Sequence, residues 1–248
     1  FAVSPDFNTV VQGAVYPTIR QWNIDTGIER LPEWTRFSHD AIVHAVAWSP
    51  DGKLLLCPAG SREGQRRMFY VTVTVADGKM KQVSNLQWSN VGRAAWLPDG
   101  KGMIVSGIES GTTQTQIWQL NYPSGEARRI TNDLNDYRDL SLTADGQVLI
   151  TVQTEAQVNI SVLPNGDATQ ARQLTTGVSQ YNGVRGMSWA PDGRLAYVSR
   201  QSGSQDIWIM NGDGKNPKQL TTPAMRADVN PSVTADGKYI VFTSSRTG

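Results

Sequence analysis

The amino-acid sequence predicts an all-β fold, a β-propeller of four-stranded antiparallel blades, and three observations lead to this prediction. A turn motif that ends in Asp-Gly recurs along the 248 residues at a nearly constant spacing. Short runs of β-branched, aromatic and aliphatic residues flank each copy. No segment carries a sustained helical period, so a helical array is the weaker alternative. We expect five complete blades followed by two strands of a sixth.

The turn motif is clearest at residues 189–194, which read Trp-Ala-Pro-Asp-Gly-Arg. Its copies are 45, 48, 46, 47 and 44 residues apart, counted between Asp6, Asp51, Asp99, Asp145, Asp192 and Asp236; the first copy, Ser4-Pro5-Asp6, lacks the glycine. Proline presets φ in such a turn, the Asp side chain caps it, and glycine accepts a positive φ. Each copy therefore predicts a hairpin between the first two strands of a blade.

The remaining strands of each blade follow the turn in a fixed order. An apolar run gives the second strand, as at residues 54–57, 148–150 and 239–242. Third strands are expected near residues 19–24, 116–120, 159–163 and 206–210, and fourth strands near residues 81–84, 129–131, 172–175 and 218–221. Because the second strands are apolar throughout, we expect neighbouring blades to cover both of their faces. The repeated Trp48, Trp96 and Trp189 are expected to pack between blades.

Bulk composition excludes some classes of partner. The repeat reaches from residue 4 to the end, so we expect a single propeller domain over residues 1–248. A net charge of +1 offers no broad positive surface, and no apolar run has transmembrane length. We therefore expect no nucleic-acid binding and no direct membrane insertion. Cys57 lies in an apolar strand and is expected to be a buried free thiol, which leaves the compartment undecided.

The two ends of the sequence interrupt the repeat. The chain begins inside a strand-like segment and stops after the second strand of blade six. Propellers usually close their ring and so avoid unpaired strand edges. We expect the chain to be a fragment of a longer propeller or protein, or to be completed by a second segment or by self-association.

Several motifs that recur in phase carry a family resemblance. Residues 48–53 read Trp-Ser-Pro-Asp-Gly-Lys, residues 206–211 read Asp-Ile-Trp-Ile-Met-Asn, and residues 218–221 read Lys-Gln-Leu-Thr. Over essentially the whole chain these series resemble the TolB-type, WD-like propeller repeat. Blade four departs from the pattern with Thr143-Ala144 and with Ser161 in place of tryptophan, and blade six lacks both tryptophan and proline.

The stretch from Arg129 to Gly248 is most similar to C-terminal propeller regions of bacterial receptor serine/threonine kinases and winged-helix regulators. The resemblance implies a non-enzymatic sensor or scaffold module of a bacterial signalling protein, and it favours a periplasmic or other extracytoplasmic location. Two alternatives stay open. One is the substrate-gating propeller of a prolyl-oligopeptidase-like hydrolase that lacks its catalytic domain, and the other is a TolB-like periplasmic interaction protein.

Catalytic and metal chemistry find little support in the sequence. Nucleophilic catalysis needs a base beside the nucleophile, but the chain has only His39 and His44 and no Gly-x-Ser-x-Gly motif. A metal shared by these histidines and Asp40 would lack further His or Cys ligands. We expect no enzymatic activity, no metal and no cofactor.

The candidate site is the set of loops that lead from each fourth strand into the next first strand. In a propeller these loops converge on one mouth of the central channel, and arginine and tyrosine are common interface anchors. We expect this mouth to bind a protein or a small polar ligand; the alternative is that its side chains are ordinary solvated loop residues. The candidate residues are Arg36, His39, Asp40, His44, Arg93, Tyr137, Arg138, Asp139, Tyr181, Asn182, Arg185, Arg226 and Asp228.

Overall fold

The structure, a computed structural model, describes residues 1–13, 19–30, 45–61, 67–222 and 227–245. Its described residues form β-strands, with short 3-10 helices at Pro164–Gly166 and Ala168–Gln170. Among these residues, no helix is both long and apolar enough to cross a membrane. The predicted all-β class is confirmed.

The chain divides into two compact units, which are described in turn. Unit 1 contains Phe1–Ser110, Thr115–Asn132 and Tyr137–Gln153, and unit 2 contains Gly111–Gln114, Asp133–Asp136 and Thr154–Gly248.

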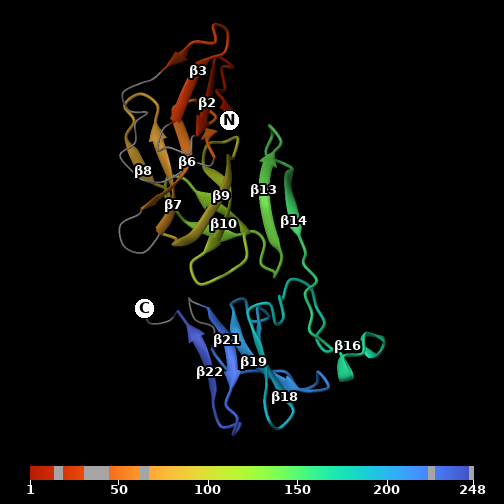
Figure 1. Cartoon of the computed structure of the whole chain (residues 1–248). Helices are drawn as coiled ribbons and strands as arrows, with labels where there is room; N and C mark the ends of the chain where they lie inside the picture. The colour runs from red at the N-terminus through yellow and green to blue at the C-terminus, as the bar shows by residue number, and fades with distance from the viewer. Residues whose placement is uncertain (14–18, 31–44, 62–66, 223–226, 246–248) are drawn as a thin grey trace. The chain divides into compact units, whose positions relative to one another are not determined.

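The first blade of unit 1 is a four-stranded sheet in sequence order. Its strands are β1 (Ala2–Val3), β2 (Thr9–Gly13), β3 (Ile19–Asn23) and β4 (Glu29–Arg30). All three pairings are antiparallel, as the repeat predicts. Figure 1 shows β2 and β3 side by side in red.

The second and third blades of unit 1 share one eight-stranded sheet. A single pair, Met68 on β7 opposite Trp88 on β9, joins two blades that the sequence predicts to be separate. β8 pairs only with residues 71–73 of β7, so the start of β7 has a free edge at which Met68 pairs with Trp88. The strands are β5 (Ala47–Trp48), β6 (Leu54–Ser61), β7 (Arg67–Thr74), β8 (Met80–Gln82), β9 (Trp88–Trp96), β10 (Gly102–Glu109), β11 (Gln116–Asn121) and β12 (Ala127–Arg129).

Blade four is two separate hairpins instead of one four-stranded sheet. β13 (Asp136–Leu142) pairs with β14 (Leu149–Thr154), and β15 (Ser161–Val162) pairs with β16 (Arg172–Gln173). The third strand is two residues long and carries Ser161 where blades three and five have tryptophan, so it has little side-chain area with which to pack. On β14, Ile150 is 69% exposed, contrary to the expectation that both faces of every second strand are covered.

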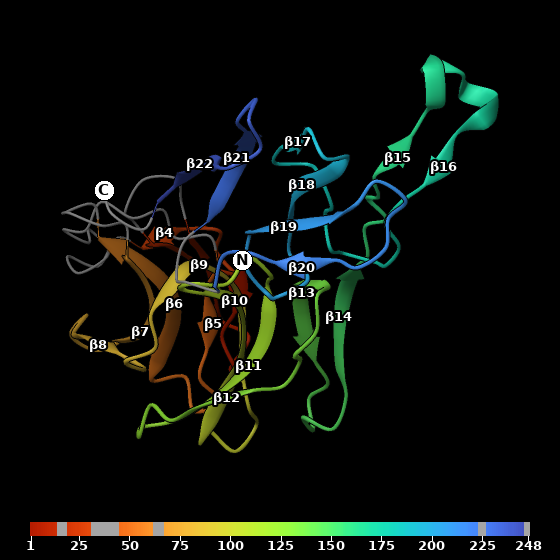
Figure 2. The ribbon, with the colours of Figure 1, turned by 90° about the horizontal axis from the view of Figure 1, so that it is seen from below.

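Unit 2 contains the fifth blade and two strands of the sixth. The four strands β17 (Met187–Trp189), β18 (Arg194–Ser199), β19 (Asp206–Asn211) and β20 (Lys218–Gln219) form one antiparallel sheet, seen in Figure 2. β21 (Asp228–Val233) and β22 (Ile240–Ser244) form a hairpin, seen in blue in Figure 1.

Apolar cores join blades one and two, blades two and three, and the second hairpin of blade four with blade five, as the sequence predicts for these blades. One core joins β2 and β3 to β6 and β7, and it contains Cys57, which is 3% exposed and is a free thiol. A second core joins blades two and three and includes Trp88, Trp96 and Trp118. In unit 2, a third core packs the β15–β16 hairpin against blade five. The packing prediction is wrong for Trp189, whose side chain is 51% exposed.

The repeat turns have the predicted chemistry. In the second turn the Ser49 hydroxyl donates to Asp51 Oδ1 at 2.7 Å, and the Lys53 amide donates to the same oxygen at 3.1 Å. The fourth and sixth turns repeat this arrangement with Thr143 and Thr234 in place of serine. These turn hydrogen bonds fix the position at which the first strand of the blade ends. They thereby fix which side chains of that strand point to each face of the sheet.

Candidate functional site

Four first strands of unit 1 surround a cavity of about 880 Å³. Its walls come from residues 1–5, 45–50, 93–96, 98 and 139–144, which belong to β1, β5, β9, β13 and the segments next to them. A volume of this size is typical of ligand-binding clefts. The geometry therefore places the first strands, and not the turn motifs alone, around the candidate site.

A bulge in β9 sets the position of Arg93 on the cavity wall. The pairing of β9 with β10 shifts between Val91 and Ala94, so that Gly92 and Arg93 together face Ser106. The Gly92 amide donates to the Tyr70 hydroxyl at 3.0 Å, and the Arg93 amide donates to Ser106 Oγ at 3.0 Å. Bulges of this kind re-aim a side chain that would otherwise follow the pleat of the sheet.

Gly92 allows this bulge to pack closely. A Cβ atom at this position would lie 2.5 Å from Ser106 Oγ, too close for any side chain. Tyr70 is buried, and its hydroxyl also donates to the Ser106 carbonyl at 2.7 Å. Burial raises the pKa of this phenol well above its ordinary value. The tyrosine therefore stays protonated and holds both sides of the bulge.

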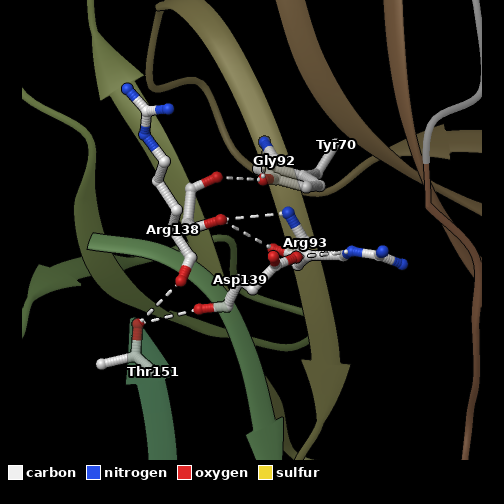
Figure 3. A network of polar contacts seen from close by, with 7 residues as sticks. Tyr70, Gly92, Arg93, Arg138, Asp139 and Thr151 are labelled. Carbon is white, nitrogen blue, oxygen red and sulfur yellow. Dashed lines mark hydrogen bonds and ion pairs between the residues drawn. The ribbon is translucent and has the colours of Figure 1, made fainter. Parts of the chain in front are cut away.

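Asp139 on β13 meets Arg93 across the cavity wall (Figure 3). The Arg93 Nε atom lies 2.9 Å from Asp139 Oδ1, and the two side chains are 53% and 66% exposed. Asp139 has a positive φ of 54°, and its carbonyl accepts a hydrogen bond from Thr151 Oγ1 at 2.8 Å. An unusual backbone conformation thus turns this carboxylate toward the arginine.

The exposed ion pair can recognise polar groups of a partner. A surface pair of this kind contributes little to folding stability, because both ions stay largely hydrated. Its guanidinium still has donors to offer, and its carboxylate still has lone pairs. The Arg93–Asp139 pair therefore presents hydrogen-bond donors and acceptors side by side on the cavity wall.

Of the other candidates in unit 1, neither joins this pair. Tyr137 is half-buried and anchors the start of β13, where its amide donates to the Thr115 carbonyl at 2.8 Å. Arg138 is exposed, and its guanidinium points away from Arg93 and Asp139 in Figure 3. The structure therefore brings together two of the four candidates that it describes in this unit.

In unit 2 a second group of candidates gathers around Arg200. The Arg200 guanidinium lies 4.4 Å from the centre of the Tyr181 ring, a cation–π contact. Burial lowers the pKa of Arg200 from its ordinary value, the charge of Arg185 lowers it further, and Tyr181 and Asp136 partly offset the change. This group carries a net positive charge beside an aromatic ring.

Two candidates of unit 2 are buried and do not present their side chains to solvent. Asn182 is 4% exposed, and its backbone amide donates to the Val158 carbonyl at 3.2 Å. Asp228 is 0% exposed, and its amide donates to the Gln205 carbonyl at 2.8 Å. Both residues lie below the surface of the loops and offer little contact area to a protein partner. Five further candidates, Arg36, His39, Asp40, His44 and Arg226, lie outside the described residues.

Sequence reasoning missed Arg200, because it searched the loops before first strands and not those after second strands. Arg200 directly follows β18, and its amide donates to the Gln180 carbonyl at 2.8 Å. In an antiparallel blade the second strand ends where the first begins, so the two loops meet at one edge. That rule would have added Arg200 to the candidates.

Known proteins resemble this chain in sequence and in fold. A Tol-Pal system protein TolB from Francisella tularensis is 28% identical over 215 residues, covering 84% of this chain and 47% of the relative. Dipeptidyl-peptidase 5 of Porphyromonas gingivalis is 30% identical over 102 residues, covering 40% of this chain and 14% of that enzyme. The chain thus spans about half the length of the TolB proteins that it matches.

A solved structure supports the fold assignment. The crystal structure of TolB from Acinetobacter baumannii superimposes with a TM-score of 0.52 and 21% identity, covering 89% of this chain and 53% of the other. The family model described as TolB beta propeller domain matches residues 35–193, more than half of the chain. The chain therefore belongs to the TolB beta propeller domain family.

Proposed function

We propose that this chain is a non-catalytic protein-interaction domain that contacts its partner through the cavity wall of unit 1. The observation that carries the proposal is the Arg93–Asp139 pair, which is exposed on the wall of a large cavity and held by bulged, hydrogen-bonded backbone. Interface anchors are often arginines held in a fixed position, because little entropy is lost when they bind. The similarity to a protein of a Tol-Pal system suggests other proteins of such a system as the first partners to test.

The test measures binding of the chain to the Tol-Pal proteins of its own source by calorimetry. Replacing Arg93 or Asp139 by alanine should weaken the complex by about tenfold, the effect of losing about 1.4 kcal/mol at an interface anchor. The unfolding free energy should change by less than about 1 kcal/mol, because the pair is solvent-exposed.

Arg20→Ala is a matched control for this test. It removes another exposed ion pair of unit 1, with Glu29 at 2.6 Å, that lies away from the cavity. This variant should bind normally. Unchanged affinity in both cavity variants, or equal loss in the control, would refute the proposal.

A sensor role is a narrower form of the same proposal. In that form, binding of a partner at the cavity wall would change the activity of an attached signalling domain. The similarity to kinase-linked and regulator-linked propellers suggests this form. An extracytoplasmic location fits this form and the interaction role equally well.

A second candidate function is substrate gating for an attached peptidase. The 30% identity to dipeptidyl-peptidase 5 over 102 residues favours it. Release of dipeptides from a chromogenic peptide by the full-length protein that contains this chain would support gating. A full-length protein without such activity would leave the interaction role as the better account.

A further inference from the structure

Unit 2 contains a cavity of about 300 Å³ that the proposed function does not use. It lies where the β15–β16 hairpin packs on blade five, and it is lined by Leu174, Tyr197 and Met210 of the shared core. Polar residues from the loops complete its wall, among them Thr176, Gln180 and Gln201. This volume is at the lower end of ligand pockets, so the cavity would hold one small molecule and not a polymer.

Tyr197 is a largely buried tyrosine on the wall of this cavity. The residue as a whole is 2% exposed, but its hydroxyl is not among the fully buried side-chain atoms that lack a partner in the described residues. Burial raises its pKa to about 12, so the phenol is protonated and able to donate. A phenol hydroxyl can both donate and accept a hydrogen bond, so this residue offers a polar group to a ligand in the cavity.

The position of Tyr197 in the repeat shows that packing does not require its hydroxyl. Strand pairing places Leu55, Met103 and Leu195 opposite the repeated tryptophans of blades two, three and five. Two residues further along, blades two and three have Cys57 and Val105, which carry no hydroxyl. Packing at this position is thus satisfied by apolar side chains, and the phenol of blade five adds a donor that packing does not require.

Two residues with side-chain amides, Gln180 and Asn182, also line this cavity. Asn182, which is 4% exposed, donates through Nδ2 to Gln180 Oε1 at 3.3 Å. The Gln180 carbonyl in turn accepts from the Arg200 amide at 2.8 Å, which fixes the backbone of the loop. Each amide group has both donors and acceptors, and the single mutual bond leaves several of them available to a ligand.

The cavity lining determines the charge of its ligand. All the residues that line it are described, and none is Asp, Glu, Lys, Arg or His. A buried ion without an opposite charge would cost several kcal/mol, so a carboxylate, phosphate or ammonium ligand is disfavoured. The apolar side chains of Leu174, Met210 and Pro217 offer a surface for the faces of a saturated ring.

From these observations we propose that the cavity between the β15–β16 hairpin and blade five binds one uncharged, hydroxyl-rich molecule of monosaccharide size. Hydroxyl groups both donate and accept, which matches the two amides and the Tyr197 phenol. The inference does not rest on the protein-interaction role, because it concerns a separate cavity lined by other residues.

The experiment titrates the full chain with D-glucose and N-acetyl-D-glucosamine, followed by saturation-transfer NMR, with D-glucuronate as the charged comparison. At least one neutral sugar should bind, and glucuronate should bind more weakly. Tyr197→Phe keeps the ring and removes only the hydroxyl, so it should weaken binding by about three- to tenfold, the usual effect of one lost hydrogen bond. Thr176→Trp, at an exposed residue of the wall, should fill the cavity and abolish binding.

Two matched controls accompany these variants. Tyr122→Phe removes a tyrosine hydroxyl in unit 1, and Gln170→Trp adds an indole at an exposed residue of unit 2 that does not line the cavity. Both should bind the sugar as the unsubstituted chain does. The inference is overturned if neither neutral sugar binds, if glucuronate binds as tightly as they do, or if Tyr197→Phe and Thr176→Trp leave binding unchanged.

Discussion

At the scale of single residues, the glycines of the repeat turns differ in what they require. Gly100 and Gly146 have nearly the same positive φ, 68° and 69°. A Cβ atom at Gly100 would meet nothing within 4 Å, whereas one at Gly146 would lie 2.7 Å from Pro98 Cδ. Gly100 is therefore needed for backbone conformation alone, and Gly146 also for contact with the preceding turn.

Replacing each glycine by alanine separates these two requirements. Gly100→Ala should lower the unfolding free energy by about 1 kcal/mol, the cost of a left-handed conformation for an L-residue. Gly146→Ala should cost that amount and a further contribution, because the proline ring must shift. Urea denaturation of both variants measures the difference, and equal midpoints would show that the Pro98 contact carries no energy.

The roles of residues that depend only on their neighbours in the sequence could be predicted. Asp51 and its neighbours cap their turn as expected, and Cys57 is a buried thiol as expected. The Arg93–Asp139 pair could not be predicted, because it depends on contacts of Gly92 with Tyr70 and Ser106, which are distant in sequence. A bulge that depends on such contacts leaves no periodic signal.

At the scale of elements, the capped turns give the blades a dependence on pH. The Thr143 hydroxyl and then the Gln147 amide lower the pKa of the Asp145 carboxyl, and Thr234 and Lys238 do the same for Asp236. A carboxyl whose folded pKa lies below its unfolded value stabilises the fold above the unfolded value, about 3.9. That stabilisation is lost as the pH falls through the lowered folded pKa.

The unfolding temperature should therefore fall as the pH is lowered from about 5 toward 2, the range in which these carboxyls take up protons. Asp145→Asn and Asp236→Asn remove a titrating group while keeping a side chain that can accept the turn's hydrogen bonds. Each variant should be less stable than the unsubstituted chain at neutral pH and should lose less stability on acidification. Calorimetry across this range tests the prediction, and parallel curves for variant and unsubstituted chain would contradict it.

Blade four shows where element prediction from the sequence stops. Its strand positions follow the repeat, but β14 and β15 do not pair. The sequence did mark this blade as unusual, since Ser161 replaces the tryptophan of its neighbours. The effect of that change depends on how much packing area a two-residue strand retains, and the repeat spacing carries no information on this.

At the scale of the whole molecule, the candidate residues belong to two units. Arg138 is an exposed arginine of unit 1, Arg185 is an exposed arginine of unit 2, and Tyr181 stacks on Arg200 in unit 2. The sequence predicted one channel mouth and one domain over residues 1–248, and both stay predictions. On the last hairpin, Tyr239 and Val241 are 68% and 62% exposed. The expectation that a further segment or a second copy covers this hairpin stays a prediction.

Alanine variants of these residues test whether one partner contacts both units. Arg138→Ala, Tyr181→Ala and Arg185→Ala should each weaken partner binding by about three- to tenfold, because arginine and tyrosine are frequent interface anchors. Thermal stability should change little for the two arginines, whose side chains are exposed. Tyr181→Ala should cost somewhat more, because it removes the aromatic face on which Arg200 rests.

Combining Arg138→Ala with Arg185→Ala then distinguishes two ways of binding. If a single partner contacts both units, the double variant should lose more binding free energy than either single variant. If only one unit contacts the partner, the variant in the other unit should bind normally and the double variant should match the remaining single one. Unchanged affinity in all three single variants would remove the predicted mouth from consideration and leave the Arg93–Asp139 wall as the place to look for the partner.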